Sequence, residues 1–155
     1  MTYSEYINAK QAEFNALPIF FAFSDKQFIQ ALNDRGLTEN DIDQVVGLYG
    51  GGYYLKKDRD AIHAFFEKHD PDELPELMKN YDFAYDAFFY EICNHEYIYN
   101  WEGDFDVLDC FYNIEYAEDK TWRDYLHEVG AREDTIRAFG DALRKYKKDM
   151  EDMGY

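Results

Sequence analysis

The chain has 155 residues, the length of one ordinary domain, and 46% of them are hydrophobic, including 15 Tyr, 13 Phe and 2 Trp. A chain of this size buries roughly 68–70% of the surface that its unfolded form exposes, so its core needs no disulfide to hold it together. The 33 acidic residues outnumber the 16 basic ones and give a net charge of −17. This charge disfavours direct binding to nucleic acids and to anionic membranes, because both would repel the chain.

Helical periodicity dominates the chain, and polar, Gly or Pro residues separate the predicted helices. The predicted helix starts are Thr2, Ser24, Thr38, Asp58, Asp82 and Thr121, with a short helix around Leu74–Met78 and a last one around Ile136–Tyr146. Thr2 and Ser24 each have a Glu or Gln three residues later, which is the spacing of a capping box. Val45 and Val46 are assigned to the third helix, which Gly47 ends.

One extended segment is predicted where residues 50–52, all glycines, form a turn that leads into a short strand at 53–55. Residues 97–120 have no single period and stay unassigned, since their first part alternates like a strand and their middle part suits a helix. We therefore predict a mainly α fold of the α-rich α+β type. It is a compact single domain over residues 1–155, with about seven helices, room for one small β-hairpin and a frayed tail at 150–155.

The sequence shows no signal for membrane insertion or export. Its longest apolar run, Leu17–Phe23, is far shorter than the ~20 residues that cross a bilayer, and its start lacks the pattern of a signal peptide. We therefore expect a cytoplasmic protein. The two cysteines, Cys93 and Cys110, lack metal-binding spacing, so we expect two buried thiols; the sequence leaves open whether they meet.

Negative charge is concentrated in residues 80–119, which contain 11 acidic residues, 13 of the 30 aromatic residues and no Lys or Arg. Carboxylates steer the encounter with a basic protein surface, and exposed aromatic rings anchor it. The candidate partner-binding residues are Asp82, Asp86, Glu91, Glu96, Tyr97, Tyr99, Trp101, Glu102, Asp104, Asp106 and Asp109. If residues 104–106 were extended, their two Asp side chains would point to one face. The alternative is a solvated acidic face above an aromatic core.

Catalytic and ligand-binding motifs are incomplete. Residues 47–52 have the glycine spacing of a phosphate-binding loop, but tyrosines follow where Lys and Ser or Thr are required. Cys93 and His95 lie two residues apart, so on a helix they point to different sides. Asp104, Asp106 and Asp109 lack the Gly and Glu of a calcium loop. We therefore predict no catalytic residue, no cofactor and no metal site.

Several segments together resemble a family of small acidic proteins of unknown function found in conjugative and other mobile elements of gut bacteria. The resemblance covers most of the chain up to about Tyr116 and implies no activity and no site residues. Its segments are AKQAEFNALPIFFAFSDKQF (9–28), GLTENDID (36–43), YYLKKD (53–58), DELPELMKN (72–80) and EICNHEY (91–97).

These observations lead to one main hypothesis and two others. The main one is a non-enzymatic acidic protein that docks on a basic, nucleic-acid-handling host protein by partial nucleic-acid mimicry, as an anti-restriction or anti-CRISPR-like factor would. The second is an accessory or scaffold protein of a mobile element that binds its partner through an aromatic groove. The third is an enzyme that uses His95 with carboxylates. Oligomeric state is not indicated by the sequence.

Overall fold

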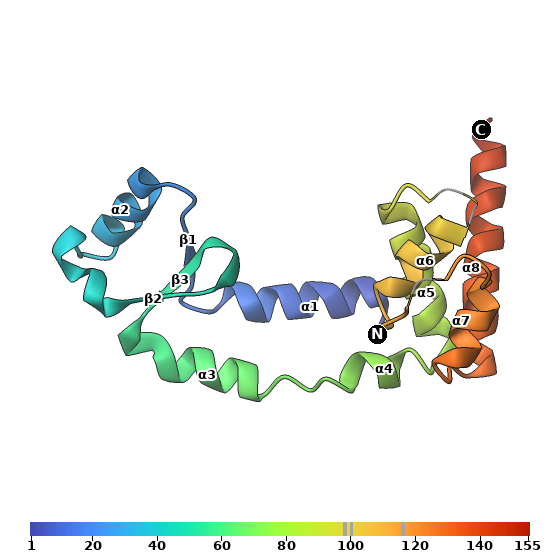
Figure 1. The fold of residues 1–155 in the computed structure, drawn as a ribbon, viewed down its shortest axis with the longest axis horizontal. Helices are drawn as coiled ribbons and strands as arrows, with labels where there is room; N and C mark the ends of the chain where they lie inside the picture. The colour runs from blue at the N-terminus through green and yellow to red at the C-terminus, as the bar shows by residue number, and fades with distance from the viewer. Residues whose placement is uncertain (98, 100, 116) are drawn as a thin grey trace. The chain divides into compact units, whose positions relative to one another are not determined.

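The computed structural model describes residues 1–97, 99, 101–115 and 117–155, with the side chain of Trp101 excepted. Contacts among them group into two compact units: a sheet unit of residues 9–69, and a helical unit of residues 1–8 together with 70–155. The fold is mainly α with one small antiparallel sheet, which confirms the predicted fold class (Figure 1). The single domain over residues 1–155 stays a prediction.

The sheet unit is built around a β-hairpin. Helix α1 (Tyr3–Asn15) ends in this unit, and β1 (Phe20–Phe21), α2 (Asp25–Asp34), η1 (Glu39–Gln44), β2 (Val45–Gly47), η2 (Tyr49–Gly51), β3 (Gly52–Leu55), η3 (Lys56–Asp58) and α3 (Arg59–Glu67) follow. Strand β3 pairs antiparallel with β1 on one side and with β2 on the other. The predicted glycine turn is confirmed, since Gly50 and Gly51 have φ values of 76° and 79°, which L-residues rarely adopt.

The predicted helix through Val45 and Val46 is wrong. The capping box at Thr38 forms, but it starts only the 3-10 helix η1. The two valines then form β2, where Val46 lies opposite Tyr54 of β3. β-Branched side chains fit a pleated strand better than a helix, and the glycine turn brings the partner strand back alongside them.

The helical unit is organised by α5 and α8. It contains the first residues of α1, then α4 (Glu73–Leu77), α5 (Tyr81–Asn94), α6 (Trp101–Asp109), α7 (Trp122–Glu128) and α8 (Glu133–Asp152). Helices α5 and α8 pack along each other and carry most of the core. Ala84, Ala87 and Ala138 are fully buried, and the ring of Phe88 meets that of Phe139 edge-on with centroids 5.0 Å apart. Helix α5 is thus fixed firmly enough to position side chains on its other faces.

Helix boundaries in this unit differ from the prediction in two places. Asn80, rather than Asp82, caps α5, because the Asn80 side chain accepts a hydrogen bond of 3.1 Å from the backbone N–H of Phe83. Asp82 instead lies in the first turn, where its charge favours the helix dipole. The unassigned segment contains α6. The last helix, α8, continues past Met150 to Asp152.

The predicted start of α7 is confirmed and gives a test of the local sequence signals. Thr121 and Asp124 form a reciprocal capping box, and α7 contributes the fully buried Tyr125 and Leu126 to the core. Thr121→Ala should lower the free energy of unfolding by about 1 kcal/mol in chemical denaturation, because it leaves a helix N–H without its acceptor. Thr121→Ser keeps the hydroxyl and should stay close to the parent; equal losses in both variants would contradict the capping role.

Candidate functional site

The predicted partner-binding acids on α5 do not form one exposed row. Asp82 is exposed, whereas Asp86 is half-buried and accepts a hydrogen bond of 2.7 Å from the backbone N–H of Tyr3. Glu91 is only 8% exposed, and its carboxylate accepts a hydrogen bond of 3.0 Å from the Tyr3 hydroxyl. Two of these three acids therefore attach the first turn of α1 to α5.

Tyr97 and Asp104 are also engaged inside the unit. The Tyr97 side chain is buried, and its hydroxyl donates a hydrogen bond to the Asp104 carboxylate. Burial raises the pKa of Asp104, while the hydrogen bond from Tyr97 opposes this shift. Tyr99, in contrast, is 50% exposed and packs edge-on against Tyr97 with ring centroids 5.2 Å apart. Of these three predicted contact residues, Tyr99 is the one that a partner can reach.

Three acids form an exposed row along α6. Glu102, Asp106 and Asp109 are all exposed and follow the i, i+4, i+7 spacing of one helix face. We call them the α6 ridge. An extended chain would place the side chains of Asp104 and Asp106 on one face. Because the segment is helical, they point in different directions instead. Glu96 is exposed as well; Trp101 begins α6, and its side chain lies outside the described residues.

The ion pairs that the structure describes for Lys and Arg do not involve the carboxylates of residues 80–119, although Lys120 follows Asp119 in the chain and interacts with its charge. Each described ion pair between a Lys or Arg and an acid joins two residues outside 80–119. They are Glu76–Lys79, Lys120–Glu128, Asp134–Arg137, Asp141–Arg144 and Lys145–Asp149. The ridge therefore presents charge that the described basic residues do not neutralise.

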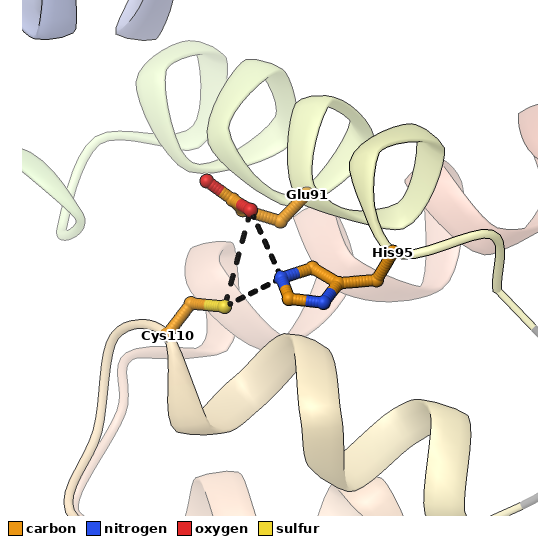
Figure 2. Close-up of side chains that lie close together, drawn as sticks. All are labelled: Glu91, His95 and Cys110. Carbon is orange, nitrogen blue, oxygen red and sulfur yellow. Dashed lines mark hydrogen bonds and ion pairs between the residues drawn. The ribbon is translucent and has the colours of Figure 1, made fainter.

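A second feature is a cluster of three different side chains, shown in Figure 2. Glu91 and His95 lie one turn apart at the end of α5, and Cys110 follows directly after α6. The Nε2 atom of His95 is 3.2 Å from Oε2 of Glu91 and 3.2 Å from Sγ of Cys110. The distance from Sγ to Oε2 is 3.9 Å. Each residue thus offers one potential metal-ligand atom at a common point.

The sequence signals for this cluster were partial. Glu91 and His95 have the i, i+4 spacing that places two side chains on one helix face, but the fold was needed to bring Cys110 to them. As predicted from their spacing, His95 forms no pair with Cys93. The expectation of two buried thiols is wrong: both cysteines are free and exposed. Cys93 lies on the outer side of α5, and Cys110 lies on the turn that leaves α6.

The cluster does not have the arrangement of a thiol activated by a base. In a catalytic relay the nucleophile and the carboxylate contact opposite nitrogens of the imidazole, whereas Cys110 and Glu91 both lie against Nε2 of His95. Burial raises the pKa of Cys110 to about 11, and the charges of Glu91 and the nearby acids add to this shift. The thiol is therefore protonated at neutral pH and is a poor nucleophile by itself.

Alkylation of a single-thiol variant tests this state of Cys110. In Cys93→Ser, iodoacetamide at pH 8 should modify Cys110 about 10-fold more slowly, or slower still, in the folded protein than in denaturant. The reason is that a far smaller fraction of the thiol is ionised in the folded protein. The rates are measured by mass spectrometry over time. Faster modification in the folded state than in denaturant would show an activated thiolate and overturn this conclusion.

Comparison with known proteins provides a family and no activity. In the described residues, no helix combines the length and apolar character needed to cross a membrane. No curated protein and no solved structure is similar enough to the chain to match it. A model of a family of unknown function matches residues 2–129, in agreement with the expected resemblance to a family of unknown function, while an origin in mobile elements of gut bacteria stays a prediction. The chain belongs to this family of unknown function, DUF7659.

Proposed function

We propose that this protein is a non-enzymatic binding protein that docks on a basic protein surface through the α6 ridge. The observation that supports this most directly is the exposure of Glu102, Asp106 and Asp109 on one helix face without described Lys or Arg partners. Tyr99, half-exposed in the same acidic segment, supplies an aromatic contact. The net charge of −17 adds a long-range field that accelerates encounter with a cationic partner.

The spacing of these charges supports the class of partner that we propose. The first and last acids of the ridge are seven positions apart on the helix, so three charges extend over roughly 10 Å at ~1.5 Å per residue. One strand of duplex DNA carries one phosphate charge per ~3.4 Å of helix axis, which makes the ridge a sparse imitation of a strand. We therefore favour a nucleic-acid-handling partner in the cytoplasm, and inhibition of a host defence enzyme on behalf of a mobile element is the specific role that we propose.

Neutralising the ridge tests this function. The triple variant Glu102→Gln, Asp106→Asn, Asp109→Asn should lose most of its capture of basic proteins from a bacterial lysate, measured by quantitative mass spectrometry after pull-down. Asp104 is left intact because Tyr97 uses it. Capture by the parent should also fall steeply between low salt and ~0.3 M salt, since ionic screening shortens the reach of exposed charges.

A matched control neutralises three exposed acids that lie in the sheet unit instead of on the ridge. Glu13→Gln, Asp43→Asn and Glu67→Gln change the net charge by the same amount away from the ridge. This variant should retain capture; an equal loss in both triple variants would show that only total charge matters and would overturn the role of the ridge.

Added duplex DNA should displace a partner that uses its nucleic-acid surface, whereas indifference to DNA would overturn the proposed partner class.

The second candidate function, a scaffold that binds through an aromatic groove, is favoured by one observation. A shallow pocket of about 440 Å³ lies within the helical unit and is lined by Ser4, Asp86, Phe89, Tyr90, Cys93 and Asn94. Tyr90 is 41% exposed at this pocket. If the groove rather than the ridge binds the partner, Tyr90→Ala should abolish capture that Tyr90→Phe retains, and the ridge variant should still bind in the same pull-down.

A further inference from the structure

We propose that Glu91, His95 and Cys110 form a binding site for a divalent transition metal of the zinc type. The three side chains belong to two separate segments, the end of α5 and the turn after α6, and point toward one another (Figure 2). Carboxylate oxygen, imidazole nitrogen and thiolate sulfur are all established zinc ligands in proteins. The site uses no side chain of the α6 ridge as a ligand, although the ridge acids Asp106 and Asp109 lie close to Cys110, so metal binding and partner capture are measured separately.

The distances in the cluster fit a tetrahedral ion. Bonds of ~2.0–2.1 Å to nitrogen and oxygen and ~2.3 Å to sulfur, at tetrahedral angles, separate neighbouring ligand atoms by roughly 3.3–3.7 Å. The observed separations are 3.2 Å between Glu91 and His95, 3.2 Å between His95 and Cys110, and 3.9 Å between Cys110 and Glu91. An ion can therefore enter with side-chain shifts of only a few tenths of an ångström.

Hydrogen bonding links these three side chains only in part, since the Cys110 thiol also has the backbone carbonyl of Asp106 as an acceptor at 3.3 Å. A neutral imidazole presents either one proton or one lone pair at Nε2, so it satisfies one of its two neighbours well and the other poorly. A central cation, in contrast, accepts lone pairs from all three groups at once. Cys110 would bind as the thiolate, and its proton would pass to solvent when the metal enters.

The carboxylate is held in place by residues behind it. The Tyr3 hydroxyl donates to Oε1 of Glu91, the oxygen that does not face His95, at 3.0 Å, and the Asn94 amide donates to Oε2 at 3.3 Å. Such outer contacts orient metal ligands and support affinity. His95 and Cys110 are exposed, which leaves one side of the site open to water as the remaining ligand.

The charges around the cluster also favour a cation. Asp106 and Asp109 lie near enough to Cys110 to influence its sulfur, and the segment 80–119 contains no Lys or Arg. Sulfur and imidazole ligands favour zinc-type ions over Mg²⁺ and Ca²⁺, which prefer oxygen. The site is therefore expected to select Zn²⁺ or Co²⁺ against these abundant cations.

Cobalt titration of the tag-free, reduced and chelator-treated full chain tests the proposal. Co²⁺ should bind 1:1 with a thiolate-to-metal charge-transfer band in the near ultraviolet, and Zn²⁺ should displace it because zinc binds such sites more tightly. Cys110→Ser should remove the band and weaken Co²⁺ binding at least 10-fold. Cys93→Ser, which removes the other exposed thiol, is the matched control and should change neither.

A second ligand variant guards against a purely structural effect. His95→Gln should weaken Co²⁺ binding at least 10-fold while circular dichroism shows the helix content of the parent. Absence of a 1:1 charge-transfer band in the parent would overturn the proposal. So would unchanged affinity in Cys110→Ser, which would indicate that surface carboxylates alone hold the ion, or loss of the band in Cys93→Ser.

Discussion

The buried carboxylate of Glu91 is the constraint on which the helical unit's candidate chemistry depends. A carboxylate inside a protein is costly unless donors surround it, and here the donors are the Tyr3 hydroxyl, the Asn94 amide and the imidazole next to it. Burial raises the pKa of Tyr3, and the Glu91 charge adds to this shift, so the hydroxyl keeps its proton. These contacts join the first turn of α1 to the end of α5, beside the turn after α6. The same bonds that stabilise the unit therefore pre-position one ligand of the proposed metal site.

The acidic middle of the chain has two structural roles. Asp86, Glu91 and Asp104 accept hydrogen bonds within the unit and are part of its framework. The acids of the α6 ridge form no ion pair with Lys or Arg among the described residues. Their charges therefore repel one another and lower the stability of the folded state. A cationic partner that binds only the folded form would relieve this repulsion and stabilise the fold. Composition alone does not distinguish the two groups, because both belong to the same segment without basic residues.

Local signals predicted most of the helices, and the errors came from contacts between distant residues. The capping residues Ser24 and Thr121 were correct because a cap depends on atoms within three positions. The prediction of Asp82 as the start of α5 is two residues late, because Asn80 caps the helix and Asp82 lies in its first turn, where an acid is also favourable. Val45 and Val46 were misassigned because their partner strand comes from beyond the glycine turn. The approach of Cys110 to His95 depends on where α6 packs, and no local pattern fifteen residues apart encodes that.

The division of the chain into its two units has a consequence for the order of folding. Residues 9–69 are contiguous, so the sheet unit can form as soon as they leave the ribosome. The helical unit needs residues 1–8 as well, yet Tyr3 finds its partners Asp86 and Glu91 only after more than eighty further residues have been synthesised. Residues 1–8 are thus among the last to reach their native neighbours, and they wait exposed to chaperones and proteases in the meantime.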